Sequence, residues 1–108
     1  MSVIVALRLK GDPAKFEEYA KAHPEIAEIK DDGVARGVIA HRFFGSLDGS
    51  EVIVVDEWPD AESFKTFFEK NQPRVQELMT GAGVEPAGEP EFWRVLDTPD
   101  KHGWDNAV

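Results

Sequence analysis

Several side chains that could do chemistry lie within one stretch of the chain, residues 41–68. His41 is the first candidate, because imidazole changes protonation nearest to neutral pH and could take a proton from a phenol or an enol. The alternative for His41 is a hydrogen-bonded structural role at a strand end. Asp56 and Glu57 follow, and since neighbouring strand residues point to opposite faces of a sheet, only one of them can face a given cleft.

A buried carboxylate needs a cationic partner or a proton, and three arginines are available as partners: Arg8, Arg42 and Arg94. For Asp56 and Glu57 this favours a structural ion pair at a seam between subunits, because ion-pair networks perturb carboxylates just as active sites do. Arg8 or Arg42 could instead hold an anionic reaction intermediate.

Aromatic residues offer a second kind of candidate. Trp58 and Trp93 could stack on a planar aromatic ligand, although such residues also fill ordinary cores. Phe64, Phe67 and Phe68 recur at helical spacing and are typical of a core-facing stripe, from which one ring could line a cavity. We therefore expect Trp58, Phe64, Phe67 and Trp93 to be substrate-binding candidates, together with the guanidinium of Arg42.

The sequence gives no support for a metal or a cofactor. The three histidines, His23, His41 and His102, are far apart with no short metal-binding spacing, and the chain has no cysteine. No glycine-rich loop follows a strand and opens a helix, as a phosphate site would require. His23 and Tyr19, one helical turn apart, could form a polar pair facing a cleft.

Composition narrows the class of protein further. With 108 residues a single domain is expected, and the formal net charge of −9 comes without any cluster of Lys and Arg. Phosphate backbones and anionic lipids require such clusters, so neither nucleic acid nor a membrane is an expected partner. No signal-like segment or membrane-length apolar run is present, which favours a cytoplasmic protein.

The first half of the chain predicts a strand, a broken helix and a second strand. Residues 2–10 read as a strand, after which Asp12 caps a helix with Pro13 in its first turn. Pro24 should interrupt this helix, and Gly33 should end it as a left-handed cap. The second strand is expected over residues 34–44, with a bulge at Gly37.

The second half of the chain again predicts a strand, a broken helix and a strand. Residues 45–50 predict a hairpin turn, and residues 51–58 a strand that is covered on both faces. Asp60 should cap a helix that is broken again at Pro73 and ends at residues 81–83. A loop over residues 84–90 then leads to a last strand over residues 91–96.

The order βαββαβ predicts an α+β, ferredoxin-like fold with an antiparallel sheet and both helical crossovers on one face. Several strands carry apolar residues on both faces, so the face without helices would expose a large apolar area. A second copy packed there would form a homodimer with two-fold symmetry.

The hairpin, the segment VIVVDEWPDAESFKTFF and the closing EFWRVL together resemble the dimeric α/β barrel superfamily, and in particular antibiotic-biosynthesis monooxygenases. The resemblance covers about residues 2–96, so we expect a domain over residues 1–96 and a tail over residues 97–108. Trp104 in this polar tail is expected to dock, for example against a partner subunit.

The resemblance implies a monooxygenase-like protein that oxidises a small aromatic or polyketide-like substrate without a cofactor. His41 and Arg8 would be its catalytic residues. The first alternative is a non-catalytic dimer that binds a small apolar or aromatic ligand, and the second is a haem-handling enzyme with a non-standard ligand. Haem-handling relatives use a helical His and an Asn on the first strand, whereas this chain has Phe67 at the corresponding helical position and no such Asn. Haem ligation by that route is therefore not expected.

Overall fold

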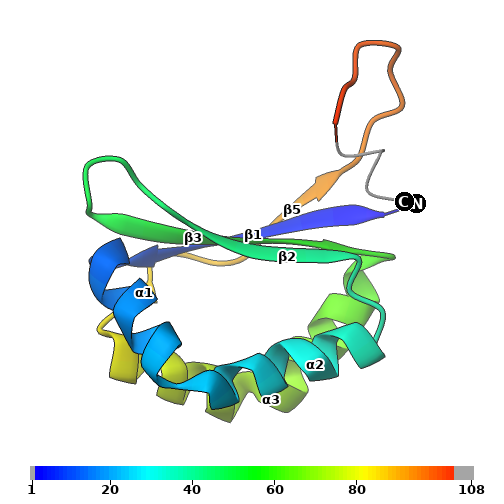
Figure 1. The fold of residues 1–108 in the computed structure, drawn as a ribbon. Helices are drawn as coiled ribbons and strands as arrows, with labels where there is room; N and C mark the ends of the chain where they lie inside the picture. Colours follow the sequence, from blue (N-terminus) through cyan, green and yellow to red (C-terminus); the bar gives the residue numbers. More distant parts are fainter. Residues whose placement is uncertain (1, 104–108) are drawn as a thin grey trace.

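The computed structural model describes residues 2–103, which form one antiparallel sheet with all the helices packed against a single face (Figure 1). The elements follow one another as β1 (Val3–Lys10), α1 (Pro13–Ala22), the short 3-10 helix η1 (Pro24–Ile26), α2 (Ala27–Ala35), β2 (Ala40–Gly45), β3 (Glu51–Trp58), α3 (Ala61–Ala82), β4 (Glu85–Pro86) and β5 (Glu91–Arg94). The predicted ferredoxin-like α+β fold is confirmed. Among the helices of the described residues, none has the length and apolarity to cross a bilayer.

Strand β1 lies in the middle of the sheet, between β3 on one side and β4 and β5 on the other, while β2 forms the far edge beside β3. In this register Val5 lies opposite both Asp56 and Phe92, so these residues share the face that the helices cover. The main core lies between that face and the helices, with Leu9 and Val52 each only 2% exposed.

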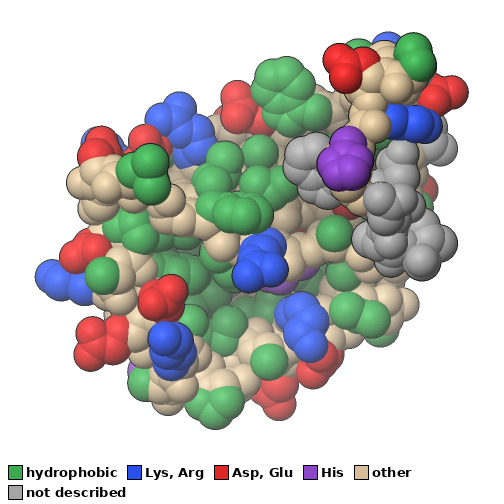
Figure 2. All heavy atoms as spheres, turned by 45° about the horizontal axis from the view of Figure 1, so that its top comes forward, with side chains coloured by type: hydrophobic (Ala, Val, Ile, Leu, Met, Phe, Trp, Pro, Cys, Tyr) green, Lys and Arg blue, Asp and Glu red, His purple; other side chains and the backbone are tan. Residues whose placement is uncertain are grey.

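The other face of the sheet carries no helix. Ala6 and Arg8 of β1 point to it together with Ile53 and Val55 of β3, because strand residues alternate between faces. Figure 2 turns this face toward the viewer and shows hydrophobic side chains gathered between scattered Lys and Arg. Trp93 of β5, opposite Ile4, belongs to this face and is 59% exposed.

The predicted helix starts and turns are confirmed. The Asp12 side chain accepts a hydrogen bond from the backbone N–H of Ala14 at 2.9 Å, and Asp60 accepts one from Ser63 at 2.8 Å. The hairpin between β2 and β3 is closed around the Asp48 carboxylate. Gly83 ends α3 with a φ of 76°, a left-handed conformation that suits a residue without a side chain.

Two predictions for residues 33–44 are wrong. Gly33 is a buried helical residue, not a left-handed cap, and a Cβ built there would lie 3.4 Å from the ring of Phe67. The helix continues to Ala35, and the chain leaves it through Gly37, whose φ of 105° serves the turn and not a bulge. Strand β2 therefore starts only at Ala40. Close packing of α2 on α3 required a small residue at position 33 within the helix.

The predicted break at Pro73 is also wrong, since α3 runs without interruption from Ala61 to Ala82. The apolar stripe explains this result, because buried residues recur at helical spacing on both sides of Pro73. Pro73 itself is exposed, so water can hydrate the carbonyl that loses its intrahelical partner. Burial along the stripe offsets the proline penalty of about 3 kcal/mol.

Helices α2 and α3 are joined by one buried polar residue. Asn71, 3% exposed, donates through its amide to the Asp32 carboxylate at 2.7 Å and to the Phe67 carbonyl at 3.0 Å. Arg36 donates to the same carboxylate at 2.9 Å. These two hydrogen bonds hold the pKa of Asp32 below its ordinary value, and the bond from Asn71 has the larger effect.

The C-terminal part differs in detail from the prediction. The expected loop over residues 84–90 contains the short strand β4, and β5 ends at Arg94 instead of reaching Leu96. Residues 97–103 contain no helix or strand and rise from the sheet on the side away from the helices (Figure 1). The predicted docking of Trp104 lies outside the described residues.

Candidate functional site

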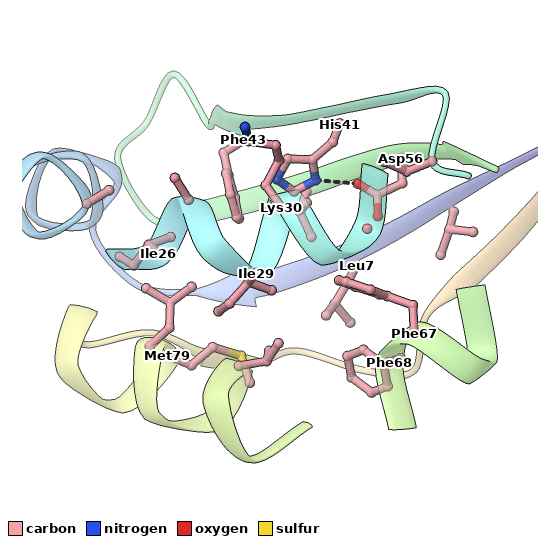
Figure 3. A pocket seen from close by; sticks show the side chains of 18 of the residues that line it. Leu7, Ile26, Ile29, Lys30, His41, Phe43, Asp56, Phe67, Phe68 and Met79 are labelled. Atoms are coloured by element: carbon pink, nitrogen blue, oxygen red, sulfur yellow. Dashed lines mark hydrogen bonds and ion pairs between the residues drawn. The ribbon is translucent and has the colours of Figure 1, made fainter. Parts of the chain in front are cut away.

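A cavity of about 340 Å³ lies between the sheet and the three α-helices. Its wall is mostly aliphatic and aromatic, and Figure 3 shows side chains from both layers pointing into it. Among the described residues 2–103, those that line the cavity with titratable side chains are His23, Lys30, His41 and Asp56. A cavity of this size and composition suits a small, largely apolar ligand held by a few polar groups.

His41 and Asp56 form the main polar contact in this wall. The pairing of β2 with β3 puts them directly opposite each other on the helix-facing side of the sheet. The His41 Nδ1 atom lies 2.6 Å from Asp56 Oδ1 (Figure 3). The His41 side chain is 29% exposed, whereas that of Asp56 is 10% exposed. The imidazole is thus anchored from the protein side and open toward the cavity.

Asp56 also accepts a second hydrogen bond, from the indole N–H of Trp58 to Oδ2 at 3.1 Å. Trp58 is 1% exposed, so this acceptor satisfies a donor that has no access to water. An ionised carboxylate only accepts hydrogen bonds, which places the proton of neutral His41 on Nδ1 and leaves Nε2 with a free lone pair. This is the arrangement in which a carboxylate orients an imidazole to act as a base.

Aromatic rings form the end of the cavity beside this pair. The Trp58 ring lies 5.2 Å from that of Phe67 and 6.1 Å from that of Phe64, centroid to centroid. Phe68 stacks on Phe64 at 5.4 Å. The cavity therefore contains three of the predicted ligand-binding residues, Trp58, Phe64 and Phe67, next to His41.

The remaining predicted site residues lie elsewhere. Arg8 points to the uncovered face of the sheet and binds Glu51, with its Nη2 atom 2.8 Å from the carboxylate. Arg42 lies opposite Val55 on that same face, as Trp93 does opposite Ile4. None of the three lines the cavity.

Sequence reasoning missed the partner of His41 and the cation at the cavity. The sequence favours a structural ion pair with an arginine for Asp56 and Glu57, whereas in the structure Asp56 faces the cavity and pairs with His41. Lys30 of α2 lines the cavity and also contacts Asp31 at 2.7 Å. The strand register was the available signal for Asp56: once Gly45 is placed opposite Val52, His41 falls opposite Asp56.

His23, the other polar lining residue, fulfils part of the prediction of a polar pair with Tyr19. Its ring stacks on that of Tyr19 at 3.9 Å and lines the cavity, whereas Tyr19 itself does not. Within residues 2–103, no group of three or more His, Asp or Glu side chains could hold a metal ion.

Fold and site together describe a ferredoxin-like α+β protein with an apolar internal cavity and a histidine–carboxylate pair in its wall. One solved structure with this fold is SnoaB, a cofactor-independent oxygenase from Streptomyces nogalater, with 18% identity and a TM-score of 0.61 over 93% of this chain and 98% of that chain. A dimeric ferredoxin-like protein from an uncultured marine organism is 12% identical, with a TM-score of 0.62 over 94% and 95%.

A third similar structure is the monooxygenase ActVA-Orf6 of Streptomyces coelicolor in complex with nanaomycin D, with 18% identity and a TM-score of 0.55 over 92% of each chain. These are structures of the kind that the sequence resemblance suggested, and at these identities they establish the fold. No protein-family model matches the chain, and no curated protein matches it in sequence.

Proposed function

We propose that this protein is a cofactor-independent oxygenase that oxidises a small, largely apolar aromatic compound. The observation that carries the proposal is the His41–Asp56 pair, 2.6 Å apart, in the wall of an apolar cavity. The likeness to SnoaB and ActVA-Orf6 supports it at the level of fold.

In the proposed reaction His41 Nε2 removes a proton from an activated CH₂ or a phenol of the substrate. For an anthrone-like CH₂, the carbanion passes one electron to dioxygen, and the resulting substrate radical and superoxide combine to form a C–O–O bond. Loss of water then leaves a ketone, so that one oxygen atom enters the product and the other leaves with the two hydrogens. The histidine returns its proton to the leaving hydroxide.

The surrounding residues have separate roles in this proposal. Asp56 holds the imidazole in the tautomer that a base requires and is a positioning residue. The rings of Trp58 and Phe67 form a wall against which a flat substrate can be oriented. Lys30, which lines the cavity where Arg8 and Arg42 do not, replaces the arginines as the cation beside the developing anion.

The test is oxygen consumption with a panel of anthrone- and hydroquinone-type compounds. Replacing His41 by alanine should lower kcat/KM roughly 10²- to 10⁴-fold, the usual contribution of a general base. His102→Ala, in the exposed tail, is the matched control and should leave the rate unchanged. A rate that survives His41→Ala would overturn the role of His41. A wild type that consumes no oxygen with any compound would favour a non-catalytic ligand-binding protein.

We also propose that two copies pair through the uncovered face of the sheet, where Phe44 is 50% and Trp93 59% exposed. In this proposal residues 1–96 form the domain and residues 97–108 a tail that docks on the partner. The support is the apolar surface in Figure 2 and the dimeric state of the similar marine protein. Light scattering should give twice the mass of one 12.0 kDa chain, and a monomeric mass would refute the pairing.

A further inference from the structure

A second histidine faces the same cavity from the opposite wall and has no part in the reaction proposed above. His23 lies between α1 and η1, in the helical layer, whereas His41 lies in the sheet. The His23 Nδ1 atom is 2.9 Å from the backbone carbonyl oxygen of Tyr19. Stacking on the Tyr19 ring at 3.9 Å, with 18° between the planes, holds the imidazole in place.

These contacts assign the tautomer of neutral His23. A carbonyl oxygen only accepts hydrogen bonds, so His23 carries its proton on Nδ1 and presents a bare Nε2. His41 is in the same state, because its Nδ1 donates to Asp56. Within residues 2–103 neither Nε2 atom has a protein partner. Each of these two walls of the cavity therefore carries a histidine whose Nε2 is free to accept a hydrogen bond.

Among the other described lining residues, Lys30 alone has a side chain that could donate to these acceptors, and its ammonium already binds Asp31 at 2.7 Å. Both oxygens of Asp56 are already used, by His41 and Trp58, and the other residues in the wall apart from Lys30 are apolar or glycine. A ligand that placed a carbonyl oxygen against either Nε2 would displace water from an acceptor without replacing its hydrogen bond. A ligand with hydroxyl groups on two edges satisfies both acceptors.

We propose that the cavity binds a flat aromatic compound with hydroxyl donors on two opposite edges, one bonded to His41 Nε2 and the other to His23 Nε2. His23 is then a specificity-determining residue that orients the ligand across the cavity. The proposal rests on the proposed function in one respect: it puts a ligand hydroxyl next to the same His41. It requires binding only, not turnover.

The test is anaerobic titration calorimetry with naphthalene, 1-naphthol and a panel of naphthalene-1,5-, 2,6- and 2,7-diols, which vary the spacing between the hydroxyls. At least one diol should bind the wild type roughly five- to tenfold more tightly than the mono-ol, the usual gain from one hydrogen bond. His23→Phe keeps an aromatic ring against Tyr19 but removes the acceptor, so it should abolish this gain. His102→Phe in the exposed tail is the matched control and should preserve it.

Binding of the mono-ol serves as the internal standard, because equal affinity in wild type and His23→Phe shows that the variant retains its cavity. The proposal is overturned if no diol binds more tightly than the mono-ol, or if the gain survives in His23→Phe. The results distinguish a failure of this binding proposal from a failure of the proposed oxygenase activity. Diol selectivity without oxygen uptake would leave a binding protein with this specificity, and oxygen uptake without diol selectivity would remove only the role of His23.

Discussion

Replacing Asp56 by asparagine should reverse the tautomer of His41 while leaving the fold intact. In the wild type, the carboxylate accepts from both His41 Nδ1 and the buried indole N–H of Trp58. An asparagine has one accepting oxygen and one donating nitrogen. Because the Trp58 N–H can only donate, the amide oxygen must face Trp58 and the amide nitrogen must face His41. His41 Nδ1 then has to accept, so its proton moves to Nε2, the atom that should act as the base.

The expected magnitudes follow from this exchange. The side chain at position 56 still makes two hydrogen bonds, but neither involves a charged group any longer. The free energy of unfolding should therefore fall by only about 1 kcal/mol. Activity should fall at least about 10²-fold, the lower end of what a general base contributes. Asp56→Ala provides a contrast, because it leaves the indole N–H of Trp58 buried without an acceptor, at a cost of about 1–3 kcal/mol.

Two measurements check this reasoning. Long-range ¹H–¹⁵N NMR of the imidazole should show the proton on Nδ1 in the wild type and on Nε2 in Asp56→Asn, whatever the protein's substrate. Oxygen uptake should fall in parallel. Asp100→Asn, at an exposed site in the tail, is the matched control for both measurements. An Asp56→Asn variant that keeps the proton on Nδ1, or that keeps full activity with the proton on Nε2, would refute the positioning role.

Two further predictions concern stability. A Cβ at Gly81 would lie 2.6 Å from Cζ of Tyr19, so Gly81→Ala should lower the free energy of unfolding by about 1–3 kcal/mol, although alanine has the higher helix propensity. Gly88→Ala is the control, because the space around Gly88 is open and its free energy of unfolding should not fall. Equal urea midpoints for the two variants would contradict this prediction. Asn71→Leu removes the hydrogen bond that chiefly lowers the pKa of Asp32. A carboxylate whose pKa is lower in the folded state than in the unfolded state stabilises the fold at any pH above its unfolded-state pKa. This stabilisation is lost as the pH falls through the folded-state pKa. Urea unfolding between pH 7 and pH 2 should therefore show a smaller acid-induced loss of stability in Asn71→Leu than in the wild type, and an unchanged loss would sink the argument.

Local signals in the sequence were sufficient for most of the fold. Asp12 and Asp60 are helix caps whose side chains bond to the next turn, and the turn between β2 and β3 follows from its glycine and aspartate content. The errors occurred where tertiary packing outweighs local preference. Gly33 is helical because α2 packs closely on Phe67, and Pro73 is helical because the stripe on both sides of it is buried.

The candidate site was only partly predictable for a related reason. Alternation along a strand correctly separates Arg8 from the helix-facing residues, but sequence alone did not say which face holds the cavity. Pairing Asp56 with His41 required the register of the hairpin, which depends on how many residues the turn uses. Helical spacing puts His23 one turn after Tyr19 and Pro24 ends the helix there, but the direction that the chain takes between α1 and η1 follows from tertiary packing.

The central position of β1 has a consequence for synthesis. The partners of Val3 are Trp58 in β3 and Arg94 in β5, so β1 is synthesised before the other strands of this sheet and completes its pairing only when the last of them is made. At roughly 5–20 residues per second, its apolar segment remains without neighbours on either edge for several seconds. Unpaired apolar edges of this kind recruit other chains and chaperones. The strand that organises the finished sheet is thus the segment of the nascent protein with the longest exposure to aggregation.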